Sequence, residues 1–117
     1  MYHSDKELFK HIFDEIVFIE NTTKHVTFET YIESDIYKRA FARSIEIIGE
    51  AVKNISTDII NRYSNIPWRN ISGMRDKLIH GYFSVNYKLV WDVAINIIPE
   101  FKTSLENIVI DNPEIFR

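Results

Sequence analysis

The sequence contains no cysteine among its 117 residues. Disulfide bonds, thiolate metal sites and a cysteine nucleophile are therefore excluded within this chain. This composition suits the reducing cytoplasm, and residues 1–6 contain neither the basic region nor the apolar run of a secretory signal. We therefore expect a cytoplasmic protein.

Glycine and long hydrophobic runs are also scarce. The three glycines are too scattered for a P-loop or a G-x-G-x-x-G phosphate cradle. No apolar stretch approaches the ~20 residues of a membrane span, so no membrane contact is expected. The four histidines, His3, His11, His25 and His80, lack metal-ligand spacing, so we expect neither a metal site nor a cofactor.

An excess of positive charge is missing as well, because the formal net charge is −3. Proteins that hold nucleic acid by bulk electrostatics usually have a basic surface. Any contact with nucleic acid must then be local, at a small cationic site that dimerisation could double. The length, with 45% hydrophobic residues, indicates a single globular domain that spans residues 1–117.

What the chain does contain is helical periodicity with clear start signals. Ser4 begins a capping box, Ser64 or Asn65 can cap a helix with Pro67 in its first turn, and Asn86 can cap another. The periodicity predicts helices over about 4–21, 34–63, 64–81 and from 86 onwards, with a loop at 22–30.

These elements predict an all-α, up-and-down four-helix bundle. Pro99 should kink or divide the last helix, which would add a short fifth one. Gly49 allows a bend or a close helix contact within the second helix. We expect the tail, residues 111–117, to be loose unless a partner orders it.

Arg75 lies in the middle of an apolar stripe when 64–81 is drawn as one helix at ~100° per residue. A buried guanidinium needs a partner for its charge and its five donors. Glu46 and Glu50 on the second helix either solvate a face or supply that partner, from across the bundle or across a dimer. The rest of the stripe is Trp68, Ile71, Leu78, Ile79 and Tyr82.

His80 projects ~140° away from Arg75 on the same helix. The two can converge if Gly81 ends the helix or if a second copy of the chain packs against this face. Asp76 lies four residues before His80, at contact spacing, and could hold the imidazole and raise its pKa. The alternative is a structural ion pair at Arg75 and a surface pair of Asp76 with His80.

The stretch Arg75-Asp76-Lys77-Leu78-Ile79-His80-Gly81-Tyr82 has the form R-x4-H-x-Y and resembles the HEPN domain family, in particular its HepT-like ribonuclease toxins of HepT/MntA toxin–antitoxin pairs. Arg43 to Ala51, ending in I-G-E-A, resembles the second helix of that family. Trp68, Val90-Trp91-Asp92 and Pro99-Glu100-Phe101 extend the similarity. It covers most of the chain and is weakest at 20–34 and after Leu105.

The resemblance implies a homodimeric, HEPN-like helical bundle that cleaves RNA, tRNA or mRNA, without a metal. It implies that Arg75 and His80 are catalytic and that Asp76 supports them. Tyr82 matches the tyrosine to which a cognate minimal nucleotidyltransferase antitoxin, MntA-like, transfers AMP.

Two other interpretations remain open. Similar helical domains pair with small nucleotidyltransferases as non-catalytic substrate-binding subunits, and the intact R-x4-H-x-Y favours the enzyme over this module. A plain dimerisation bundle gives no reason for a charge within the apolar stripe at Arg75.

Overall fold

The computed structural model describes residues 3–79 and 84–117, and within them all regular structure except one isolated bridge is helical. This confirms the all-α class. The helices are α1 (Asp5–Thr23), α2 (Phe28–Glu33), α3 (Asp35–Lys53), α4 (Thr57–Arg62), α5 (Trp68–Ser72), α6 (Met74–Leu78), α7 (Tyr87–Asp92), the π-helical turn η1 (Val93–Ile97), α8 (Ile98–Asp111) and α9 (Pro113–Phe116).

The first helix starts as the sequence predicts. The backbone N–H of Glu7 donates to Ser4 Oγ at 3.2 Å, which satisfies one of the free donors of the first turn. The loop predicted at 22–30 is wrong at both ends, since α1 continues to Thr23 and α2 begins at Phe28. Thr27 caps α2 by accepting from the N–H of Thr30, so a threonine that indicated a loop instead begins a helix.

The long helix predicted over 34–63 is divided in two. α3 ends at Lys53 and is capped by Asn54, whose side-chain amide donates to the carbonyl of Glu50 at 2.9 Å. Ser56 then begins α4 by accepting from the N–H of Ile59. Asp5, at the start of α1, accepts from both the N–H and the hydroxyl of Ser56, at 2.9 and 2.6 Å. These contacts fix the interruption against α1 and override the apolar periodicity that runs across it.

The helix predicted over 64–81 is also divided. α5 and α6 are separated by Gly73, where an added Cβ would lie 3.1 Å from the carbonyl oxygen of Arg69. Pro67 precedes α5 without a side-chain cap, so the predicted cap at Ser64 or Asn65 is wrong. α6 ends at Leu78, earlier than expected, because the next residue is already extended.

The last helix begins with the predicted cap, since Asn86 Oδ1 accepts from the N–H of Leu89 at 3.1 Å. Pro99 occupies the first turn of α8, directly after the π-helical turn η1. A proline within a helix lacks one donor and crowds the carbonyl four residues earlier, and a wider turn before it relieves both problems. The sequence predicted a kink or a division at Pro99. The backbone instead stays helical and changes from a π-helical turn to an α-helix there.

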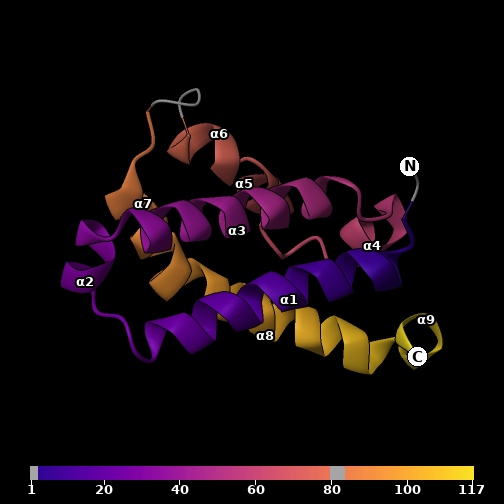
Figure 1. Cartoon of the computed structure of the whole chain (residues 1–117). Helices are drawn as coiled ribbons and strands as arrows, with labels where there is room; N and C mark the ends of the chain where they lie inside the picture. The colour runs from indigo at the N-terminus through magenta and orange to yellow at the C-terminus, as the bar shows by residue number, and fades with distance from the viewer. Residues whose placement is uncertain (1–2, 80–83) are drawn as a thin grey trace.

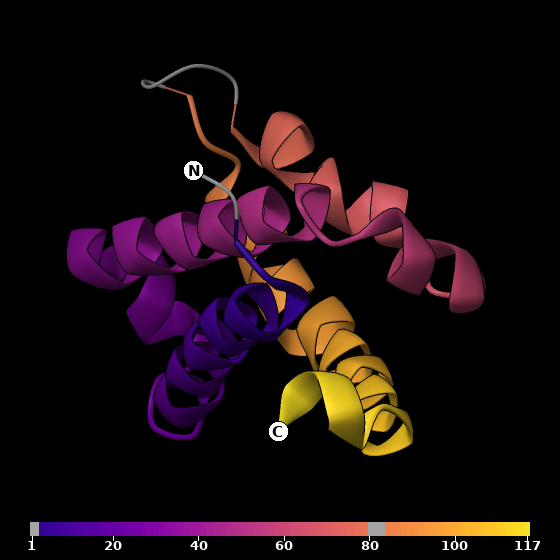
Figure 2. The same ribbon diagram turned by 90° about the vertical axis from the view of Figure 1, so that its right-hand side faces the viewer.

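α3 is the centre of the molecule. It runs antiparallel to α1, and α1 and α8 lie on one side of it while α5 and α6 lie on the other (Figures 1 and 2). At Gly49 of α3 an added Cβ would lie 3.4 Å from the carbonyl oxygen of Ser72, so the predicted close helix contact is confirmed with α5. The buried side chains of α3, among them Phe41, Ile45 and Ile48, form one core with those of its neighbours.

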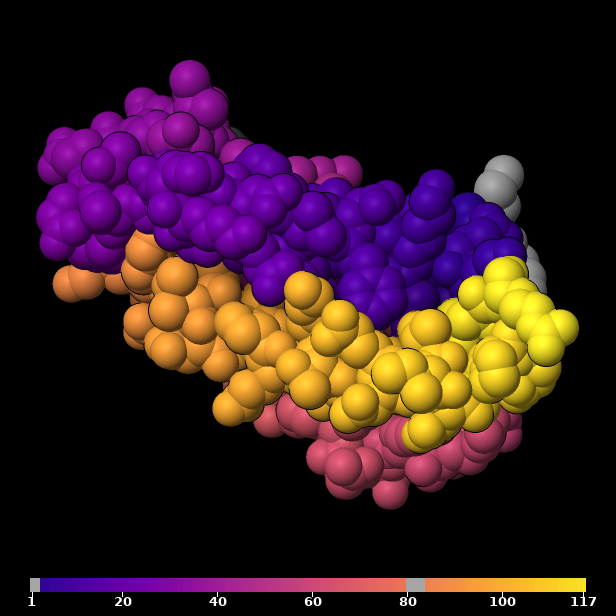
Figure 3. Space-filling model, turned by 90° about the horizontal axis from the view of Figure 1, so that it is seen from below, coloured from indigo at the N-terminus to yellow at the C-terminus, as the bar shows by residue number. Residues whose placement is uncertain are grey.

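The chain end is not loose, which corrects the sequence prediction. Residues Pro113–Phe116 form α9, and the ring of Phe116 packs on that of Phe9 with centroids 4.6 Å apart. Seen from below, α8 lies beside α1 and α9 meets the beginning of α1 (Figure 3). The partner that orders the tail is thus α1 of the same chain.

None of the helices in residues 3–79 and 84–117 combines the length and the apolar character that a bilayer crossing requires.

Asn112, between α8 and α9, is completely buried. Its Oδ1 accepts from Arg62 Nη2 at 2.7 Å, and its Nδ2 donates to the hydroxyl of Tyr63 and to the carbonyl of Ile108, both at 2.8 Å. One amide therefore joins α4 to the end of α8 while meeting its own hydrogen-bonding needs.

We predict that Asn112→Ala lowers the free energy of unfolding by about 2 kcal/mol, because it leaves buried polar groups without partners. Urea unfolding followed by circular dichroism measures the change. Asn107→Ala, at an exposed position of α8, is the control and should stay within about 0.5 kcal/mol of wild type. Equal losses in both variants would contradict the role of Asn112.

Candidate active site

Arg75 lies on α6 with its side chain 39% exposed, at the edge of the apolar surface and not within it. The division at Gly73 causes this, because the buried positions of α6 are Met74 and Leu78 and the upper part of the predicted stripe belongs to α5. Arg75 Nε donates to Glu46 Oε2 at 3.2 Å, and Nη1 donates to Asp76 Oδ1 at 3.5 Å. The partner that the sequence demanded is therefore Glu46 of α3, from within the same chain.

Glu46 holds a second arginine on its other oxygen. Arg43 Nη1 donates to Glu46 Oε1 at 2.7 Å. The hydrogen bond from Arg43 and then that from Arg75 lower the pKa of Glu46, although its partial burial opposes them. The same pairing with Glu46, followed by that with Asp76, raises the pKa of Arg75. Both ends of the pair are thus fixed as ions at neutral pH.

Asp76 is exposed, and its partner among the described residues is Arg75. The predicted contact with His80 used helical spacing, and that premise fails because α6 ends two residues before His80. The angle of ~140° between Arg75 and His80 assumed one continuous helix as well, so it no longer applies. Asp76 contacts one of the two predicted catalytic residues, and its support of the other stays a prediction.

His80, Gly81 and Tyr82 lie outside the described residues, but both flanks of this segment are described. Ile79 and Val85 form an antiparallel bridge, and the N–H of Asn86 donates to the carbonyl of Leu78 at 2.9 Å. The chain that leaves α6 and the chain that enters α7 are therefore side by side. Helical periodicity gives no indication of this pairing, although the β-branched residues at both positions are compatible with it.

Tyr31 holds the start of α7, two residues beyond this bridge. Nothing in the sequence pattern predicted that role. The side chain is fully buried and its hydroxyl donates to the carbonyl of Tyr87, the first residue of α7, at 2.8 Å. Burial raises the pKa of Tyr31, which keeps the hydroxyl protonated as a donor. Its ring lies 4.9 Å from that of Trp91 and 5.2 Å from that of Phe41. α2 thereby anchors the start of α7 next to the candidate site (Figure 1).

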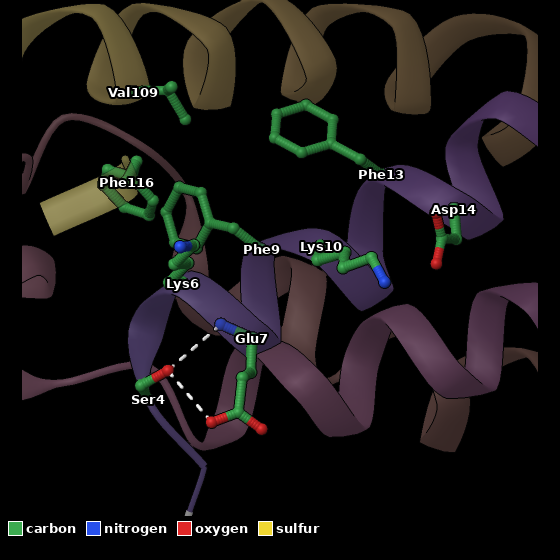
Figure 4. Close-up of a pocket in the computed structure, with 9 residues that line it drawn as sticks. All are labelled: Ser4, Lys6, Glu7, Phe9, Lys10, Phe13, Asp14, Val109 and Phe116. Carbon is green, nitrogen blue, oxygen red and sulfur yellow. Dashed lines mark hydrogen bonds between the residues drawn. The ribbon is translucent and has the colours of Figure 1, made fainter. Parts of the chain in front are cut away.

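A pocket of about 550 Å³ lies elsewhere. It is enclosed by α1, the end of α8 and α9, with the rings of Phe9, Phe13 and Phe116 facing it and Lys6 and Lys10 at its rim (Figure 4). None of the predicted site residues that the structure describes lines it. In the described part of the chain, no group of three histidine or carboxylate side chains is placed to hold a metal ion.

Comparison with known proteins identifies the class. A model of the family described as "Ribonuclease HepT-like" matches residues 12–108. The chain therefore belongs to the HepT-like ribonuclease family, as its R-x4-H-x-Y pattern and helical fold indicated.

Individual relatives agree with this family. The "Probable ribonuclease HepT" of Thermococcus cleftensis is 38% identical over 108 residues, which cover 92% of this chain and 98% of the relative. Two proteins named "Putative RNase" are similar as well. That of Caldanaerobacter subterraneus subsp. tengcongensis is 43% identical over 86% of this chain and 89% of its own length. One from Methanocaldococcus jannaschii is 46% identical over 86% of this chain and 84% of its own length. No solved structure matches the chain.

We predict that Glu46→Gln lowers the free energy of unfolding by about 0.5–1 kcal/mol at pH 7, because it removes the charge that holds two guanidinium groups. The pKa of Glu46 is lowered by folding, so its contribution is present above the unfolded pKa of about 4.5 and is lost as the pH falls through the folded pKa. The two proteins should become equally stable at low pH.

Urea unfolding at several pH values from 7 down to acid measures this effect. Glu50→Gln is the matched control, since Glu50 is 57% exposed and its carboxylate contacts Lys53 at 3.5 Å. A difference between wild type and Glu46→Gln that does not change with pH would contradict the prediction.

Proposed function

We propose that this protein is a toxin of the HepT type, a metal-independent endoribonuclease whose catalytic residues are Arg75 and His80. The observation that carries the proposal is the geometry of Arg75. Its guanidinium is partly exposed and is oriented by carboxylates from α3 and α6. Arg75 lies four residues before Ile79, which pairs with Val85 in the antiparallel bridge. The family membership of the chain supports the same chemistry.

Arg75 would bind the phosphate at which the RNA is cut. A guanidinium has five N–H donors, and Glu46 and Asp76 use one on Nε and one on Nη1. Donors therefore remain for a non-bridging phosphate oxygen, and a planar guanidinium fits that group in a bidentate manner. The cation would also stabilise the additional charge that develops on the phosphate in the transition state.

His80 would carry the protons. The 2′-hydroxyl oxygen of the RNA attacks the adjacent phosphorus, the bond from phosphorus to the 5′-oxygen breaks, and a 2′,3′-cyclic phosphate and a 5′-hydroxyl result. A base takes the proton of the 2′-hydroxyl and an acid gives one to the leaving 5′-oxygen. Imidazole titrates near neutral pH and can serve in either role. Asp76 would support the charged form of that imidazole.

A homodimer would complete this arrangement. The reaction needs a base and an acid, and the R-x4-H motif supplies one histidine per chain. Two chains that meet at α6 would bring two copies of Arg75 and His80 to one RNA strand. They would also double a cationic site on a protein whose net charge is −3.

Tyr82 would be the regulatory site. A cognate minimal nucleotidyltransferase would join the tyrosine oxygen to the α-phosphorus of ATP, with release of pyrophosphate. The AMP group would place a bulky anion two residues from His80, block the RNA sterically and neutralise Arg75. Silencing the toxin therefore requires no conformational change beyond the modification itself.

The experiment that tests the proposal is incubation of the purified protein with total RNA and with a defined tRNA in EDTA, followed by analysis of the product ends. Cleavage by wild type, with 2′,3′-cyclic phosphates and no cleavage by His80→Ala, is the expected result. Absence of cleavage by unmodified, dimeric protein would reject the enzyme and favour the non-catalytic substrate-binding subunit of a minimal nucleotidyltransferase.

We predict that His80→Ala and Arg75→Ala each reduce the cleavage rate at least about a hundredfold, since one removes the proton carrier and the other the phosphate cation. Both should keep the oligomeric state of wild type in size-exclusion chromatography with light scattering. Arg39→Ala, an exposed arginine on α3, should keep the wild-type rate. Full activity in either site variant would refute the assignment of that residue.

We also predict that Tyr82→Phe cleaves RNA at the wild-type rate but is no longer silenced by its nucleotidyltransferase and ATP. Intact-protein mass spectrometry should show AMP on wild type and none on the variant. Tyr87→Phe changes the next tyrosine along the chain, and this variant should be modified and silenced normally. A Tyr82→Phe protein that is still switched off by AMP transfer would exclude this residue.

A further inference from the structure

Glu46 joins two arginines that come from different helices. Arg43 of α3 donates to Glu46 Oε1 at 2.7 Å and Arg75 of α6 donates to Oε2 at 3.2 Å. Because the two acceptors belong to one carboxylate, the two guanidinium groups are neighbours on the surface. The side chain of Arg43 is 68% exposed and that of Arg75 39%, so both can reach a ligand from solvent.

A small hollow of about 230 Å³ adjoins Arg43 on the side of α1. Arg43 itself lines it, together with the imidazoles of His3, just before α1, and His11 on α1. The rest of its lining is Leu8, Ile47, Ala51 and the polar residues Glu50 and Asn54. The two imidazole rings meet edge to face with centroids 5.8 Å apart. Aromatic side chains beside an apolar surface are what unpaired bases stack on in complexes with single-stranded RNA.

We propose that Arg43 and Arg75 together bind the backbone of the RNA substrate as a two-guanidinium clamp, and that a base next to the clamped phosphate occupies the hollow beside Arg43. This proposal rests on the proposed function, because it extends the site of Arg75 along the substrate. The RNA strand would cross α3 from the hollow at α1 to the end of α6.

Charge pairing makes the clamp a local feature of this surface. Glu50 has Lys53 at 3.5 Å, while Glu46 carries both arginines. These carboxylates hold the cations in place and also cancel their long-range field. The attraction for RNA then depends on direct N–H contacts to phosphate, which a guanidinium makes in a planar, bidentate way and an ammonium does not.

Arg43 could alternatively serve only to orient Glu46 and, through it, Arg75. The salt dependence of binding separates the two roles. Each phosphate contact to single-stranded nucleic acid contributes about 0.7 to the slope of log K against log salt concentration. A purely structural role of Arg43 leaves that slope unchanged, whereas a phosphate contact reduces it.

The experiment measures binding in the His80→Ala background, where the strand stays intact. Fluorescence anisotropy follows a labelled single-stranded RNA at pH 8, where ordinary imidazoles are neutral, over about 50–300 mM NaCl. Arg43→Gln should weaken binding about tenfold and lower the slope by about 0.7. Arg43→Lys should recover the slope but only part of the affinity. Arg39→Gln, the same charge change one turn earlier on α3, should leave both within twofold.

The hollow is tested by His11→Ala in the same assay. Loss of a stacking surface should weaken binding about fivefold with an unchanged salt slope. Thermal unfolding checks that every variant stays folded, which the exposure of Arg43 and His11 makes the expected result. If His11→Ala binds RNA as tightly as the wild-type protein, the proposal that a base occupies the hollow is wrong.

Two outcomes overturn one proposal and leave the other standing. If Arg43→Gln binds RNA like Arg39→Gln while cleavage requires Arg75 and His80, the clamp is wrong and the ribonuclease stands. If the wild-type protein does not cleave RNA, but Arg43→Gln lowers the affinity for RNA and the salt slope of binding, the clamp stands and the catalytic function is wrong.

Discussion

The carboxylate of Glu46 is the constraint on which the candidate site depends. It sits on α3, the helix that packs against α1, α2, α5, α6 and α7, and it binds an arginine on each oxygen. Arg75 comes from α6, a helix of five residues, and isolated helices shorter than ~12–15 residues are marginal in water. The position of the guanidinium is therefore a property of the packing between α3 and α6, and not of α6 itself.

Two of the helix starts were predicted correctly from local signals in the sequence. Ser4 and Asn86 cap their helices as expected, because a cap is a contact between residues three positions apart. The interruption of the long second helix could not be predicted in this way. Asp5 and Ser56, whose contact fixes it, are separated by 51 residues. A break decided by a partner that distant leaves the apolar periodicity around it intact.

The candidate site shows the same division between local and long-range information. The place of Arg75 among apolar residues demanded an anionic partner, and α3 offered Glu46 and Glu50 on one side. The choice between them depends on how far α6 is offset along α3, which the close approach at Gly49 helps to set. The end of α6 could not be predicted for a similar reason. It is followed by the pairing of Ile79 with Val85, a residue that lies beyond the helix in the chain.

The short length of α5 and α6 has a consequence for the order in which the molecule assembles. Neither helix can persist before α3 offers its surface, and the bridge beyond α6 needs residues up to Asn86. On a ribosome, Arg75 therefore has no fixed geometry until about the first three quarters of the chain have emerged. The same segment should open readily in the native state, because both helices are short and depend on contacts with distant parts of the chain. A candidate site built on such an element has no defined geometry in the nascent chain.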